Sequence, residues 1–253
     1  MVILLGFAIA VAIGLTGVGG GVLTAPLLIV CLGMPATQAV GTALLFVAAV
    51  KIFAVPVYLY RRQVDWRTLA SMLAGGVPGV VAGSLLLRGA GARGLNSVVL
   101  GAVGLVVAVS ASLTLWRTLC SAGPAAGRNR FGALGAASSA IGVEVGFSSA
   151  GAGALGTVAL FQLTSLPAAE VVGTDLVFGF VLSLIGGGFH LAAGTYDPGV
   201  AARLIGGGLA GAVAGAYLAS VVPARALRIA IALLLVGLGG ELGLRALGSL
   251  WAR

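Results

Sequence analysis

Gly14-Leu-Thr-Gly-Val-Gly-Gly-Gly21 is a glycine cluster inside a long apolar stretch, and Gly146-Phe-Ser-Ser-Ala-Gly-Ala-Gly153 repeats it 132 residues later. At that offset, residues 8–95 and 140–227 share 28 identities in 88 pairs without a gap. Composition alone would give roughly 11 identities. The sequence therefore predicts an internal duplication. The matched motifs are Pro35-Ala36 with Pro167-Ala168, Val40-Gly41-Thr42 with Val172-Gly173-Thr174, and Gly75-Gly76 with Gly207-Gly208.

The composition is that of an integral membrane protein. Hydrophobic residues make up 60% of the chain and charged residues 8%, and the mean hydropathy is +1.17. These values leave too little polar surface for a water-soluble fold. The chain has 14 Lys and Arg against 6 Asp and Glu, and most of the basic residues fall in short gaps between apolar stretches. We interpret this charge as positive-inside topology and exclude nucleic-acid binding.

Eight apolar stretches, four in each repeat, predict an all-α polytopic membrane protein. They cover about 2–31, 36–60, 68–88, 95–116, 132–165, 168–193, 200–221 and 226–248. The second, third and fourth stretches of each repeat have the length of one helix that spans a hydrocarbon core of about 30 Å. The first stretch of each repeat is broken at its glycine cluster. Each glycine weakens a helix by roughly 1 kcal/mol relative to alanine, which favours two half-helices that meet near mid-membrane.

The whole chain, 1–253, is expected to form one transmembrane domain, with repeat 1 at 1–116, a basic linker at 117–131 and repeat 2 at 132–253. The membrane topology has two alternatives. If all eight stretches cross, the arginines of loops and tails divide nine to four between the two sides. If the first stretch of each repeat turns back, they divide eight to five. The positive-inside rule thus favours eight crossings, with parallel repeats and both termini cytoplasmic.

Ionisable residues within the apolar stretches are candidates for function, because a charge near mid-membrane costs at least a few kcal/mol. Lys51, the one lysine of the chain, is the candidate to meet an anion, and its alternative is a side chain that reaches the interface. Asp175 and Glu144 are candidates for proton coupling, and Asp175 also for pairing with Lys51. Asp175 aligns with Ala43 and is therefore no feature of a shared scaffold. The alternative for Glu144 is a protonated carboxyl bonded to a neighbouring helix.

Hydroxyl residues and freed backbone N–H groups beside the glycine breaks suit an oxyanion, because a half-helix N-terminus carries unpaired donors and about half a positive charge. The predicted substrate-binding residues are Thr16, Gly17, Gly19, Gly20, Thr42, Lys51, Ser148, Ser149, Gly151 and Thr174. The alternative is that the hydroxyl residues allow close helix packing and bond back to their own backbone. We interpret His190, which aligns with Tyr58 near a stretch end, as interfacial, and its alternative is a proton carrier. The pattern G-G-x-x-G-x-x-x-G at 75–83 and 207–215 indicates close helix packing.

Several motifs, taken together and in this order, resemble those of a known family. In repeat 1 they are Gly14-Leu-Thr-Gly-Val-Gly-Gly-Gly21 followed by Pro26, Ala39-Val-Gly-Thr42, Arg61-Arg-Gln-Val-Asp-Trp66 and Gly75-Gly-Val-Pro-Gly-Val-Val-Ala-Gly83. In repeat 2 they are Val143-Glu-Val-Gly-Phe-Ser-Ser149, Val172-Gly-Thr-Asp175 and Gly187-Gly-Phe-His190. On these motifs the chain resembles the sulfite exporter TauE/SafE family over nearly its whole length outside 117–131.

The resemblance implies a multi-pass permease of the inner cell membrane that moves small sulfur oxyanions or organosulfonates. Our hypothesis is a secondary transporter, acting as an exporter, that alternates access between the two repeats while Asp175 or Glu144 carries a proton. The alternative is a passive anion channel. We expect no enzymatic activity, because the histidine has no evident serine partner and Gly173-Thr-Asp175 is not the G-x-G-D motif of aspartyl hydrolases. We expect no cofactor and no metal. The expected partners are the small anionic substrate and the lipid bilayer, and a homo-oligomer stays open.

Overall fold

The computed structural model is all-helical over the residues that it describes, 1–16, 21–92, 96–120, 130–149, 151–218 and 224–251. The all-α class expected from the sequence is therefore confirmed. Ten helices form in these ranges: α1 (Val2–Thr16), α2 (Gly21–Leu32), α3 (Ala36–Tyr60), α4 (Trp66–Ala92), α5 (Asn96–Cys120), α6 (Phe131–Ser148), α7 (Gly151–Leu163), α8 (Ala168–Ala192), α9 (Pro198–Leu218) and α10 (Ala224–Trp251).

Each of the six shorter apolar stretches forms a single helix, namely α3, α4, α5, α8, α9 and α10. These helices have 21 to 28 residues, which corresponds to about 32–42 Å at 1.5 Å per residue. Within the described residues, α3, α6, α8 and the segment Trp66–Ala90 of α4 are long and apolar enough to cross a membrane. α5 extends to Cys120, so the first residues of the expected linker are helical.

The two long first stretches each divide into two helices. α1 ends at Thr16 and α2 begins at Gly21, whereas α6 ends at Ser148 and α7 begins at Gly151. Ser149 caps α6 in the left-handed conformation, with φ 63°, and its N–H donates to the Val145 carbonyl at 2.8 Å. A left-handed residue at this position is a common helix end.

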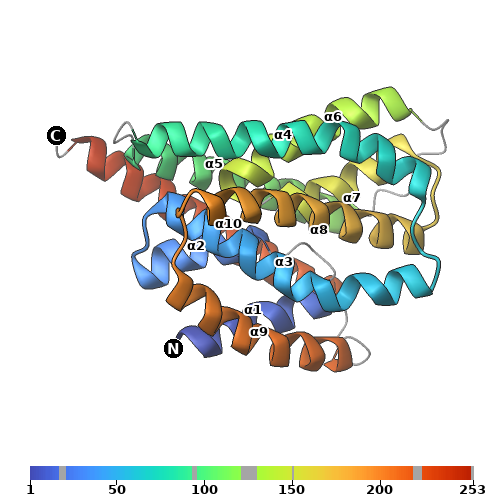
Figure 1. Ribbon diagram of the computed structural model, residues 1–253, viewed down its shortest axis with the longest axis horizontal. Helices are drawn as coiled ribbons and strands as arrows, with labels where there is room; N and C mark the ends of the chain where they lie inside the picture. Colours follow the sequence, from blue (N-terminus) through green and yellow to red (C-terminus); the bar gives the residue numbers. More distant parts are fainter. Residues whose placement is uncertain (17–20, 93–95, 121–129, 150, 219–223, 252–253) are drawn as a thin grey trace.

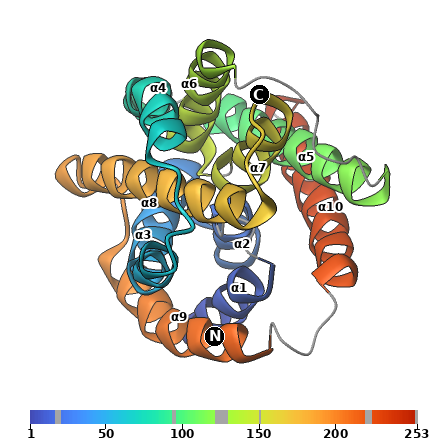
Figure 2. The ribbon, with the colours of Figure 1, turned by 90° about the vertical axis from the view of Figure 1, so that its right-hand side faces the viewer.

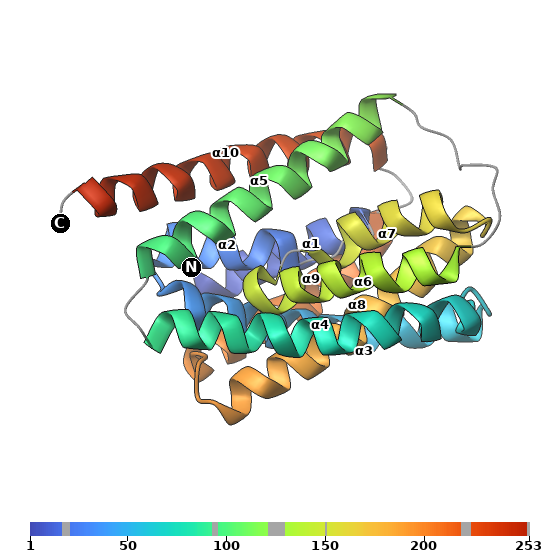
Figure 3. The ribbon, with the colours of Figure 1, turned by 90° about the horizontal axis from the view of Figure 1, so that it is seen from above.

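The broken stretches turn back, so that the two ends of each stretch lie at the same end of the molecule. The N–H of Arg130, just before α6, donates to the carbonyl of Leu163 at the end of α7 (2.9 Å), so α7 returns to the end of the molecule where α6 starts. Figures 1 and 3 show α2 returning in the same way, at the opposite end, to where α1 starts. The preference for eight crossings is therefore wrong. The preference rested on how the arginines divide between the two membrane sides, and this division differs by only one residue between the alternatives.

The central helices α3 and α8 are antiparallel. Gly41, near the start of α3, lies against His190 near the end of α8, and Gly173, near the start of α8, lies against Gln63 beyond the end of α3. About half of the residues of each helix are buried, and Phe46 of α3 and Phe178 of α8 are fully buried. α3 and α8 occupy equivalent positions in the two repeats, 132 residues apart. Because they are antiparallel, the two halves of the chain have opposite orientations, as expected if the repeats are inverted.

Two further helix pairs join the halves through glycine. A Cβ added at Gly75, Gly79 or Gly83 of α4 would overlap the backbone of α6, and one added at Gly207 or Gly211 of α9 would overlap the backbone of α1. The expected close packing is confirmed at these glycines. Figure 2 shows the α4–α6 and α1–α9 pairs on opposite sides of the molecule, with α2 and α7 between them and α5–α10 along one flank.

Candidate functional site

Lys51 and Asp175 are both buried in the middle layer of the protein. Lys51 on α3 and Asp175 on α8 are each 3% exposed, so the lysine does not extend to the interface. The two groups interact electrostatically, but no ion pair forms between them. Among the described residues the ion pair within 4.0 Å is Glu241–Arg245, on an exposed face of α10. The structure therefore brings the two predicted charges near each other without neutralising either by direct contact.

The carboxyl group of Asp175 is held by the half-helix α7. Thr157 Oγ1 lies 2.8 Å from Asp175 Oδ2, within hydrogen-bond distance. The other oxygen, Oδ1, is buried and has no hydrogen-bond partner among the described residues. It lies against Gly156, where an added Cβ would overlap it. The carboxyl group is thus enclosed on the α7 side, with one oxygen bonded and the other not.

Glu144 lies between α6 and α5, away from the contact of Asp175 with α7. On α6, its Oε1 accepts a hydrogen bond of 2.7 Å from the hydroxyl of Ser110 on α5. Ser110 is buried, whereas Glu144 is partly exposed. This geometry fits the alternative of a carboxyl bonded to a neighbouring helix. Proton coupling by Glu144 stays a prediction.

Thr42 and Thr174, expected together at the substrate, lie at opposite ends of the α3–α8 pair. Thr42 Oγ1 accepts the backbone N–H of Asp197 at 3.0 Å, and Thr174 Oγ1 accepts the backbone N–H of Asp65 at 3.0 Å. From Thr42 to the end of α3, where Thr174 lies, is about 27 Å along the helix. A single small anion cannot contact both hydroxyls.

The two aspartates in these bonds are helix caps. Asp65 accepts the N–H of Thr68 at 3.0 Å at the start of α4, and Asp197 accepts the N–H of Val200 at 2.9 Å at the start of α9. Side-chain oxygens at this position satisfy the first free amides of a helix. Each threonine of the repeated Val-Gly-Thr motif therefore fastens the connection that leads into a helix of the opposite half.

The remaining predicted binding residues gather at the helix breaks. Ser148 and Ser149 are buried at the end of α6, where the Ser148 hydroxyl donates to the Glu144 carbonyl at 3.0 Å. Gly151 begins α7, so its N–H is one of the first amides of that half-helix, which have no partner within the helix. The others lie outside what the structure describes: the side chain of Thr16, and residues Gly17, Gly19 and Gly20.

His190 lies in the last turn of α8 and is fully buried between helices; its interfacial depth stays a prediction. Its Nδ1 lies 2.7 Å from the hydroxyl of Thr195, and its Nε2 has no hydrogen-bond partner in the described ranges. The close approach of α3 at Gly41 covers the ring, which a pattern along one helix does not reveal. In the described part of the chain, no cluster of three or more His, Cys, Asp or Glu could hold a metal ion.

Sequence reasoning missed the two hydroxyl partners of the carboxyl groups, Thr157 and Ser110. A signal for Thr157 was present. At the 132-residue offset Thr157 aligns with Ala25, just as Asp175 aligns with Ala43, so the polar pair in one half corresponds to two alanines in the other. Both alanines are fully buried.

Comparisons with known proteins agree with this architecture. The family model described as "Sulfite exporter TauE/SafE" matches residues 2–242. The chain is 29% identical over 250 residues to "Probable membrane transporter protein YjnA" of Bacillus subtilis (strain 168), covering 95% of this chain and 98% of that protein. It is 34% identical over 112 residues to "Probable membrane transporter protein" of Xylella fastidiosa (strain 9a5c), covering 44% and 41% of the two chains. No solved structure matches.

Proposed function

The chain belongs to the sulfite exporter TauE/SafE family of membrane transporters, and we propose that it exports small sulfur-containing anions, such as sulfite or organosulfonates, by proton-coupled secondary transport. A transporter is consistent with the expected absence of enzymatic activity. The observation that carries the proposal is the pair Lys51 and Asp175, buried on facing helices without an ion pair.

The chemistry of this pair suits an anion and a proton. A buried charge is costly unless it is neutralised, and a direct ion pair would neutralise both groups at once. Here an anion can neutralise the Lys51 ammonium while a proton neutralises Asp175. The N-terminus of α7 adds N–H donors on the side of Asp175. Anion and proton would then be bound together.

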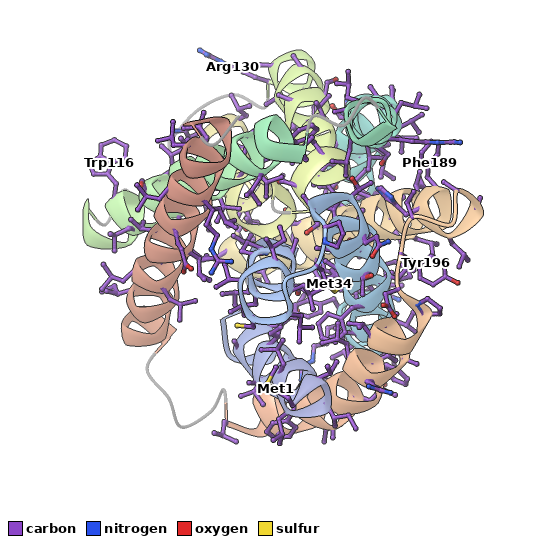
Figure 4. The ribbon with its side chains drawn as sticks, turned by 90° about the vertical axis from the view of Figure 1, so that its left-hand side faces the viewer. Met1, Met34, Trp116, Arg130, Phe189 and Tyr196 are labelled. Carbon is purple, nitrogen blue, oxygen red and sulfur yellow. The ribbon has the colours of Figure 1, made fainter. Side chains whose placement is uncertain are left out.

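We infer the membrane orientation from the helix directions together with the positive-inside rule. Because the broken stretches turn back, the arginines divide eight to five, and the richer end holds the α3–α4 connection with Arg61, Arg62 and Arg67. We place this end in the cytoplasm and both termini on the opposite side of the inner membrane. Figure 4, viewed toward the end with the termini, shows Trp116 at the periphery, where large apolar side chains are exposed to the lipid.

Alternating access needs two bodies that move against each other, and the glycine contacts suggest which helices form them. Since α4 packs backbone to backbone on α6, and α9 on α1, each pair forms one body with helices from both halves. The two bodies lie on either side of the α3–α8 pair (Figure 2). In this proposal the glycine-joined pairs move, and the intact repeats do not move as units.

The test is uptake of labelled sulfite into proteoliposomes, with and without an imposed pH gradient, with sulfoacetate and sulfate as competitors. We expect saturable uptake that the gradient accelerates. In Asp175→Asn the acceleration is lost while anion binding survives, and in Lys51→Gln binding is lost. Glu241→Gln is the matched control, because Glu241 lies on an exposed face of α10. Uptake that does not saturate would favour the passive anion channel. Gradient-driven uptake in Asp175→Asn would refute the coupling role.

A further inference from the structure

We propose that Thr157 is a positioning residue that senses the protonation state of Asp175 and transmits it to the first turn of α7. The Thr157 hydroxyl hydrogen is donated to the Asp175 carboxylate when that group is charged, and to the Gly153 carbonyl when Asp175 holds a proton. This inference rests on the proposed function, since it assigns the mechanism of coupling at the same site.

The Thr157 hydroxyl has two short contacts but a single hydrogen atom to donate. Thr157 Oγ1 lies 2.8 Å from Asp175 Oδ2 and 2.6 Å from the Gly153 carbonyl oxygen. Both distances are those of hydrogen bonds, but a hydroxyl has a single hydrogen to donate. A charged carboxylate and a carbonyl are both acceptors only. With a charged Asp175, one of the two short contacts therefore has no hydrogen between its oxygens.

A proton on Asp175 removes the conflict. The Asp175 O–H then donates to Thr157 Oγ1, and Thr157 donates to the Gly153 carbonyl, so both contacts are hydrogen bonds. When the proton leaves, the hydroxyl turns to the carboxylate and withdraws from Gly153. Gly153 lies in the first turn of α7 and has φ 114°, so this turn departs from regular helix geometry. Loss or gain of the proton therefore changes a bond in the part of α7 that faces the break.

The other charged groups around Asp175 do not replace this sensor. On α3, Lys51 is the charged group that acts on the carboxyl. α7 has no titratable residue, and on α4 Arg67 and Arg88 stand near the two helix ends. On α6, Glu144 is bonded to Ser110 of α5. The titratable residues of α8 itself, Glu170 and His190, lie five and fifteen positions away.

The corresponding place in the other half argues against a purely structural role for Thr157. There Ala25 and Ala43 occupy the aligned positions, and both are fully buried. The fold thus tolerates an apolar contact at this helix junction. A hydroxyl and a carboxyl that occur together in one half indicate a function which that half alone performs.

The experiment compares Thr157→Val with Thr157→Ser and with a control on the same segment, Thr164→Val. Thr164 bonds to the Leu160 carbonyl at 2.6 Å, which is the same kind of back-bond without a carboxylate partner. Two readouts are measured: the pH profile of sulfite uptake, and the infrared band of the protonated Asp175 carboxyl in purified protein, assigned by its loss in Asp175→Asn.

We expect Thr157→Val to move the midpoint of the pH profile upward by about one pH unit, because valine cannot donate to the carboxylate. The carboxyl band should shift in the same variant, while Thr157→Ser and Thr164→Val stay close to wild type. If Thr157→Val does not fold, Thr157→Ala serves in its place.

The infrared readout separates this inference from the proposed function. If no variant and no wild-type protein transports sulfite, but the band shifts in Thr157→Val alone, the substrate assignment fails and the sensor stands. The inference is overturned if the profile and band of Thr157→Val match wild type. It is also overturned if no band at any pH disappears in Asp175→Asn.

Discussion

The substitution Gly79→Ala tests the glycine contact that joins α4 to α6. A Cβ at this position would overlap the carbonyl oxygen of Ser139, and it would lie 3.0 Å from the Val143 nitrogen and 3.1 Å from the Gly142 Cα. All three are backbone atoms of α6, so no side-chain rotation can relieve the overlap. The two helices must separate.

The size of the effect follows from a matched control on the same helix. Gly89 also lies within α4, but a Cβ there has nothing within 4 Å. Alanine favours a helix over glycine by about 1 kcal/mol at both positions. That gain is common to the two variants, so the difference in unfolding free energy between them isolates the packing cost. Overpacking of this kind costs about 1–3 kcal/mol.

The assay is denaturant unfolding in detergent micelles, followed by tryptophan fluorescence. Gly89→Ala should be as stable as wild type or more stable, and Gly79→Ala should lie about 1–3 kcal/mol below Gly89→Ala. Gly211→Ala, where the added Cβ would overlap the Phe7 carbonyl of α1, should behave like Gly79→Ala. Equal stability of Gly79→Ala and Gly89→Ala would refute the close contact and the paired bodies built on it.

Three other substitutions test the site. Thr42→Val leaves the N–H at the start of α9 without its acceptor and should cost about 1–3 kcal/mol of unfolding free energy, whereas Thr42→Ser should not; equal losses would contradict the bond. Gly156→Ala places a Cβ on the Asp175 carboxyl oxygen and should abolish the response of uptake to a pH gradient, and an unchanged response would contradict that contact. Ser110→Ala should cost about 1–2 kcal/mol, and a double-mutant cycle with Glu144→Gln should show coupling; additive effects would exclude their hydrogen bond.

The sequence predicted the helices well where length alone decides them. The stretch expected at 36–60 forms α3 with the same bounds, and the break expected in 132–165 falls between Ser148 and Gly151. An apolar run of membrane length has few alternatives to a single helix, and a glycine cluster weakens it locally.

Whether the broken stretches cross or turn back could not be predicted from the sequence. The hairpin of α6 and α7 closes through a backbone hydrogen bond between Arg130 and Leu163, and any residue type can make that bond. The arginine count had to decide between topologies that differ by one residue, and it favoured the wrong one. Backbone hydrogen bonds do not depend on side-chain charge, so the distribution of arginines does not reveal them.

The site shows a related limit. Lys51 and Asp175 were candidates because they lie in apolar stretches, but the residues around them were not predicted. Thr42 and Thr174 were expected at the substrate because their motif is repeated, yet each accepts a backbone N–H from the connection before a helix of the other half. Because the motif recurs in both halves, its threonines serve a structural contact that both halves make.

Polar residues that do not recur therefore mark function better than those that do. The glycines that lie against aromatic rings recur in both halves: Gly76 lies against Phe178 and Gly208 against Phe46, and each of these residues aligns with its counterpart at the 132-residue offset. The charged residues inside the apolar stretches, and their hydroxyl partners, do not recur. The unmatched pairs are Lys51 with Ser183, Asp175 with Ala43, Thr157 with Ala25, Glu144 with Ala12, and Ser110 with Leu242. A scaffold of two opposed halves offers equivalent routes to both membrane faces, while polar groups on one side alone allow a single substrate and a single proton to be coupled in a fixed ratio.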